Sequence, residues 1–138
     1  MPRTMAMDVG DRRIGIALSD PLGIIAQGLT TIVRDRRPEN DLPKFKALIE
    51  EHDVDRIVVG WPLETSGRVG GQARKVERFV EDLKTVIDLP FDFWDERMTS
   101  AQAERALLEA DTRRAKRKEL IDKVAATVIL QSWLDAHR

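Results

Sequence analysis

The sequence contains no cysteine among its 138 residues. Disulfide bonds, thiolate zinc sites and cysteine nucleophiles are therefore excluded, and the absence is compatible with a reducing compartment. The chain also has no hydrophobic run long enough to cross a membrane, and its N-terminus lacks the apolar run of a secretion signal. We therefore expect a cytoplasmic protein that has no membrane partner.

An excess of charge of either sign is also missing. The formal net charge is -1, although charged residues make up 34% of the chain and hydrophobic residues 42%. These fractions are typical of a globular rather than a disordered protein. Any surface that binds nucleic acid must therefore come from local clusters of Lys and Arg. The length suits one hydrophobic core, and we expect residues 1–138 to form a single domain.

Asp8 stands in an apolar stretch that is otherwise typical of a buried strand. Alternation along a strand sends Met7 and Val9 to one face of the sheet and Asp8 to the other. An unpaired buried carboxylate is costly, so Asp8 needs a basic side chain, hydrogen bonds or a bound cation. The simpler alternative is an aspartate that caps the turn at Gly10.

The hydrophobic pattern predicts the order of the elements. Gly10 and Gly15 are expected to frame a tight turn between the first two strands. Apolar runs bounded by turn residues predict strands around residues 5–9, 14–18, 24–33, 56–60 and 91–94. Apolar residues at helical spacing predict helices that begin at Asp41 as a cap, at about residue 73, at Thr99 as a capping residue, and at Glu119. The three sequential strands predict an antiparallel meander. The whole order indicates a mixed sheet, with three antiparallel strands followed by parallel strands and with helices on both faces.

Two further carboxylates fall where they can join Asp8. Glu96 immediately follows the strand at 91–94, and functional residues gather at the carboxyl ends of parallel strands. Asp122 lies on the apolar stripe of the last helix and therefore points along its inward face. If the three meet in one cleft, they need a compensating charge. Taken singly, Glu96 could instead pair with Arg97, and Asp122 could be a first-turn acid favoured by the helix dipole.

Oxygen ligands favour hard divalent cations, so the expected cofactor is Mg²⁺ or Mn²⁺. Zinc is disfavoured because cysteine is absent and both histidines lie outside these motifs. A pair of such ions can activate water and stabilise the leaving oxygen during phosphodiester hydrolysis. We therefore expect Asp8, Glu96 and Asp122 to be the metal ligands and the catalytic residues of a nuclease.

Four segments resemble those of the YqgF/RuvX family in order and separation: MDVGDRRIGIALSD, GWPLETSGRVG, DERMTSAQAERALLE and RKELIDKVAATVILQSWLD. The resemblance covers nearly the whole chain. It implies a ribonuclease H-like fold with a mixed five-stranded sheet, and it places the family's acidic site on Asp8, Glu96 and Asp122. Members are described as pre-16S rRNA nucleases and formerly as Holliday junction resolvases. Glu64 departs from the pattern, because many relatives carry Asn there.

Basic side chains near these acids are the candidates for binding nucleic acid. The run at residues 113–118 precedes the helix that carries Asp122, so phosphates held there would lie close to the metals; the alternative is a solvated loop. The glycine-rich loop at residues 61–72 would let the backbone approach a phosphate chain, or it is only a flexible connection. Trp61 could stack on a base or belong to the core. The candidates are Arg12, Arg13, Arg68, Arg74, Lys75, Arg97, Arg113, Arg114, Lys116, Arg117 and Lys118.

These features together predict a metal-dependent nuclease that acts on structured RNA, above all in 5'-end processing of precursor 16S rRNA. One alternative is a resolvase of four-way DNA junctions, whose symmetric cutting requires a dimer. Another is a nucleic-acid-binding module that has the fold without catalysis. An actin-like ATPase is disfavoured, because it needs two such domains and this chain has room for one. The sequence leaves monomer and homodimer open.

Overall fold

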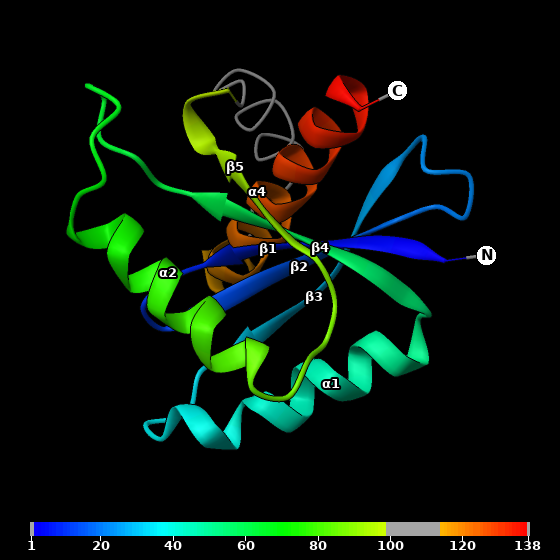
Figure 1. Cartoon of the computed structure of the whole chain (residues 1–138), viewed down its shortest axis with the longest axis horizontal. Coiled ribbons are helices and arrows are strands. Elements are labelled where there is room, and N and C mark those ends of the chain that lie inside the picture. Colours follow the sequence, from blue (N-terminus) through cyan, green and yellow to red (C-terminus); the bar gives the residue numbers. More distant parts are fainter. Residues whose placement is uncertain (1, 99–113, 138) are drawn as a thin grey trace.

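A computed structural model gives the arrangement of the elements (Figure 1). It describes residues 2–98 and 114–137, and for residues 98 and 114–121 it describes the backbone alone. In this part of the chain one sheet has the strand order β3-β2-β1-β4-β5. The strands are β1 (Arg3–Val9), β2 (Arg13–Ser19), β3 (Ala26–Val33), β4 (Val54–Trp61) and β5 (Phe91–Asp95).

The first three strands are antiparallel neighbours, and β4 runs parallel to both β1 and β5. This confirms the predicted sheet of three antiparallel strands followed by parallel strands. The helices are α1 (Leu42–Glu51), α2 (Gly71–Lys84) and α4 (Arg114–Ala136), with short 3-10 turns η1 (Pro38–Asn40) and η2 (Glu96–Met98). As Figure 1 shows, α1 and α2 lie on one face of the sheet and α4 lies on the other.

The alternation predicted for the first strand decides which face each residue joins. Met7 packs in the core between the sheet and the α1/α2 layer, together with Phe45 and Val80. Ala6 instead packs against Ala126 of α4. Asp8 is two residues beyond Ala6, so it lies on the α4 face.

The third strand begins later than predicted. The Asp20 carboxylate accepts hydrogen bonds from the backbone N–H groups of Ile24, at 2.7 Å, and Ile25, at 3.1 Å. These bonds hold both isoleucines in the turn, so β3 starts at Ala26 and not at residue 24. High β-propensity at positions 24 and 25 is overridden by a local side-chain contact.

The first helix begins where expected, but its cap differs. Asp41 occupies the N-cap position of α1 without a capping hydrogen bond from its side chain. Its carboxylate accepts hydrogen bonds from the backbone N–H of Asp35 and from Lys44 Nζ instead. The predicted role of Asp41 as a side-chain cap is therefore wrong.

The last helix is longer than predicted. It begins at Arg114, so the basic run from that residue onward forms its first turns and does not separate two helices. Arg, Lys and Ala are strong helix formers, and the run contains no residue that would end a helix. The predicted helix that begins at Thr99 lies outside the described residues, and so does Arg113. None of the helices in residues 2–98 and 114–137 is long and apolar enough to cross a membrane.

Candidate active site

Asp8 lies in the second-last position of β1, half-buried and directly opposite Gly15 of β2. On its other side, β1 pairs with β4 in a register that joins Met7 to Val59. One residue further along both parallel strands, Asp8 is therefore beside Gly60. Gly15, Asp8 and Gly60 form a row across three neighbouring strands, which we call the acidic row.

Gly15 lies inside β2 and not in the turn, in contrast to its predicted role. A methyl group added at this position would overlap the backbone carbonyl oxygen of Asp122 in α4. Only glycine allows the helix to approach the strand this closely. This close approach brings Asp122 to one end of the acidic row.

Gly60 has the same effect at the other end. A Cβ atom there would lie 2.6 Å from Ile129 Cδ1 and 3.3 Å from the carboxyl carbon of Glu96. Glu96 is the first residue of η2, which follows β5. The side chain of Glu96 therefore lies over Gly60, and the three predicted catalytic residues surround one row although they come from distant parts of the sequence.

The carboxylate of Asp122 has a basic partner. Its Oδ2 accepts a hydrogen bond from Arg13 Nε at 3.0 Å, and both side chains are partly exposed. Arg13, which is predicted to bind nucleic acid, is paired in the structure with a predicted metal ligand. Among the described residues, no three acidic, histidine or cysteine side chains are gathered closely enough to hold one metal ion.

Two of the predicted binding arginines are held by acids. Arg68 pairs with Glu64 at 3.2 Å, and both side chains are exposed. Arg97 makes a forked contact with Asp95 through Nε and Nη2. Hydrogen bonds from the Arg97 side chain lower the pKa of Asp95, and the same contact raises the pKa of Arg97. Arg97 is therefore fixed by Asp95, the residue that precedes Glu96.

The remaining candidates lie on several different elements. Lys75 lies 3.5 Å from Asp11, and Arg74 lines a hollow of about 560 Å³ together with Phe93. Trp61 is partly buried, packs against the exposed ring of Phe93 with centroids 5.6 Å apart, and donates a hydrogen bond from Nε1 to Glu77. The backbone of Arg114, Lys116, Arg117 and Lys118 belongs to the start of α4, and Arg12 lines a second hollow that is described below.

The two residues that shape the row most directly are not predicted from the sequence to position the site. The hydrophobic pattern places Gly60 only at the end of a strand, and Gly15 at a turn. Glycine within an apolar strand is a recognised signal for close approach of another backbone or side chain, so this signal was present. The pairing of Arg13 with Asp122 spans 109 positions and has no local signal.

The sheet order, the helices on both faces and the acidic row define a ribonuclease H-like protein. Thermus thermophilus RuvC, solved with a Holliday junction substrate, has a TM-score of 0.59 at 14% identity and covers 99% of this chain and 96% of its own. The fowlpox virus resolvase, solved with Holliday junction DNA, has a TM-score of 0.61 at 10% identity, with 98% of both chains covered. These likenesses concern the fold alone.

Sequence comparison is more specific. The family model described as "RuvX: Holliday junction resolvase" matches residues 2–136. A protein of Desulforamulus reducens is 52% identical over 97% of both chains, and one of Clostridium acetobutylicum is 51% identical over 97% of this chain and 98% of its own. Both bear the name "Putative pre-16S rRNA nuclease". The chain belongs to the RuvX family, which confirms the resemblance.

Proposed function

We propose that this chain, a nuclease by family membership, uses the acidic row to hydrolyse phosphodiester bonds in precursor 16S rRNA. The observation that carries the proposal is the convergence of Asp8, Glu96 and Asp122 on one row of the sheet. Sites of this kind need a compensating positive charge, because adjacent carboxylates repel each other.

The chemistry of the donor set fits Mg²⁺ or Mn²⁺. All three side chains offer carboxylate oxygens, which are the ligands that hard divalent cations prefer. In the proposal, Asp8, Glu96 and Asp122 would be the residues that hold the metal ions. When bound, such ions supply an activated water and stabilise the leaving oxygen.

Arg13 is a positioning residue in this proposal. Its Nε–H donates a hydrogen bond to Asp122 Oδ2. This ion pair also fixes the direction of the other carboxylate oxygen, Oδ1. The guanidinium also offsets part of the negative charge around the row. Asp122 is thereby fixed by two contacts, the close approach to Gly15 and the bond from Arg13.

The proposed substrate is RNA because of the degree of similarity. The relatives that bear the rRNA nuclease name are about half identical to this chain over nearly full length. The resolvases solved with DNA junctions are only 10–14% identical. A four-way DNA junction remains the second candidate, since the family description names a Holliday junction resolvase. We also propose that the whole chain is one domain that acts in the cytoplasm.

A direct substrate comparison tests this proposal. The purified protein is incubated with a fragment of precursor 16S rRNA that includes the 5' extension, and in parallel with a four-way DNA junction, each in Mg²⁺ and in Mn²⁺. We expect cleavage of the RNA within the extension and no cleavage of the junction. Junction cleavage by a dimer, with the RNA left intact, would replace the RNA proposal with the resolvase alternative.

A further inference from the structure

A basic hollow lies outside the acidic row, where the β1–β2 turn meets the loop that follows β3. It has a volume of about 500 Å³, and its lining includes Arg12, Arg34 and Arg36 as well as Asp11 and Asp35. We infer that this arginine hollow binds a backbone phosphate of the nucleic acid whose cleavage was proposed above. The inference rests on that proposed function for the identity of the polymer.

The two acids in the lining are engaged by other partners. Asp35 accepts hydrogen bonds from the backbone N–H of Arg37, at 2.9 Å, and from Asn40 Nδ2, at 3.2 Å. These bonds lower the pKa of Asp35, the Arg37 N–H most strongly, so this carboxylate is ionised and satisfied. Asp11 lies 3.5 Å from the ammonium of Lys75. Neither acid uses its charge on an arginine of the hollow.

The arginines therefore keep donors for a ligand. Arg34 is fixed by a hydrogen bond from Nη1 to the carbonyl oxygen of Gly10, at 2.9 Å, and its guanidinium lies 4.9 Å from the ring centroid of Phe79. Arg12 and Arg36 are exposed and form no ion pair with any residue in the part of the chain whose side chains are described. Guanidinium groups present forked donors that match phosphate oxygens.

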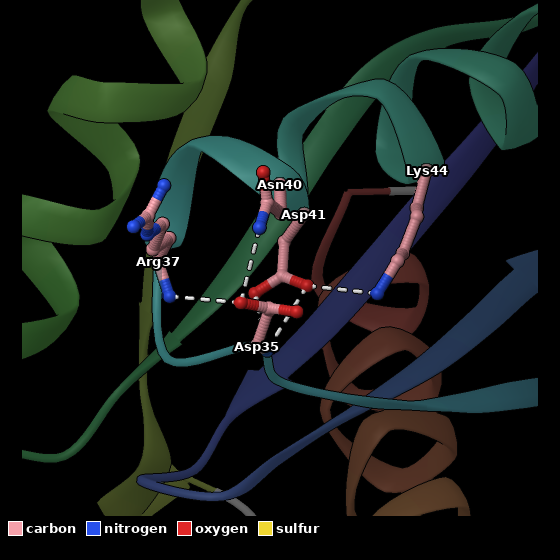
Figure 2. A network of polar contacts seen from close by, with 5 residues as sticks. All are labelled: Asp35, Arg37, Asn40, Asp41 and Lys44. Carbon is pink, nitrogen blue, oxygen red and sulfur yellow. Dashed lines mark hydrogen bonds and ion pairs between the residues drawn. The ribbon is translucent and has the colours of Figure 1, made fainter.

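The loop that carries Arg34 and Arg36 is held in place by a buried carboxylate. Figure 2 shows the Asp41 side chain extending from the start of α1 towards this loop, with its carboxylate directed at the backbone of Asp35 and at Lys44. Asp41 is fully buried, and its two oxygens lie 3.0 and 3.2 Å from the Asp35 N–H. The loop is thus tied to the start of α1, and a tied loop loses less entropy when it binds a ligand.

The position of the hollow favours a phosphate within a polymer over a free phosphate ion. Arg12 follows Asp8 by four residues, so its Cα lies at most ~14 Å from that of Asp8. Every nucleotide of a strand carries a phosphate, so more than one phosphate of a bound strand falls within this range of the acidic row. A substrate strand with its scissile bond at the acidic row can therefore place a neighbouring phosphate in the hollow.

The test measures how RNA affinity depends on salt. A fluorescent RNA duplex with a single-stranded 5' extension is titrated with wild-type protein and with the double variant Arg12→Gln/Arg36→Gln, in EDTA so that no cleavage occurs. Loss of one phosphate contact is expected to reduce the slope of log affinity against log salt by about 0.7–0.9. Arg3→Gln, which removes one positive charge at the opposite end of β1, is expected to keep the wild-type slope.

Three outcomes separate the possibilities. A slope equal to wild type in a folded double variant overturns the inference, as does an equal loss of slope in Arg3→Gln. An unchanged RNA slope combined with loss of inorganic phosphate binding, measured by calorimetry, also overturns it, because the hollow would then be a site for free phosphate. Since binding is measured without cleavage, failure of the proposed function would appear only in the cleavage assays and not here.

Discussion

At the scale of single residues, two glycines decide where the acidic residues meet. Gly15 admits the backbone of α4 beside Asp8, and Gly60 admits the side chain of Glu96 on the other side. Asp8 could be recognised from the sequence because a carboxylate in an apolar strand is anomalous. The Arg13–Asp122 pair could not, because it depends on the placement of a helix more than 100 positions away.

Replacement of Gly15 by alanine is expected to destabilise the protein. The added methyl group would overlap the backbone of Asp122, so α4 must shift away from β2. Overpacking of this kind typically costs about 1–3 kcal/mol of unfolding free energy. Chemical denaturation measures this cost, and nuclease activity is expected to fall with it because Asp122 moves.

Gly71→Ala is the matched control for this substitution. A Cβ atom at Gly71 would meet no other atom within 4 Å, and the residue begins α2. We expect this variant to be as stable as the wild type, or more stable by about 0.4–1 kcal/mol. Equal stability of the two alanine variants would contradict the role given to Gly15.

At the scale of elements, the positions where strands and helices begin depend on side-chain contacts that the hydrophobic pattern does not reveal. The order of strands and amphipathic helices along the chain could be predicted from hydrophobic periodicity, which depends on local sequence. The start of β3 depended on Asp20, and Gln131 of α4 adds hydrogen bonds to the Ala26 N–H and the Ile24 carbonyl oxygen. The turn before β3 is therefore stabilised by hydrogen bonds within the turn and by hydrogen bonds to α4.

This turn is expected to contribute stability that is lost in acid. Hydrogen bonds from the Ile25 and Ile24 N–H groups lower the pKa of Asp20. A carboxyl group whose pKa is lower in the folded state contributes its full stabilisation above the unfolded pKa of about 3.9, and loses it as the pH falls through the folded pKa. Asp20→Asn keeps an acceptor oxygen but does not titrate.

The measurement is the free energy of unfolding as a function of pH. Below about pH 4 the wild type is expected to lose stability more steeply than Asp20→Asn, because only the wild type must protonate this group. Above this range the two curves are expected to run parallel. Equal steepness in acid would show that Asp20 does not stabilise the turn through its charge.

At the scale of the whole molecule, a mixed sheet between two helical layers brings three distant segments of the chain to one row of residues across its central strands. The fold class, the family and the acidic residues could be predicted from the sequence, because each has a pattern of its own. The arginine hollow could not, since it joins two turns whose charges look like ordinary solvated loops until the partners of Asp11 and Asp35 are known. Which charges remain available to a ligand is a property of the folded chain.

The central claim is that Asp8 carries metal-dependent cleavage, and Asp8→Asn tests it most directly. The wild type and the variant are compared on the precursor 16S rRNA fragment in Mg²⁺ and in Mn²⁺. Asp55→Asn, a substitution at an exposed position near the start of β4, is the control for loss of one acidic charge. We predict that Asp8→Asn is folded and cleaves nothing, while Asp55→Asn cleaves at the wild-type rate; cleavage by Asp8→Asn at the wild-type rate would contradict the proposed mechanism.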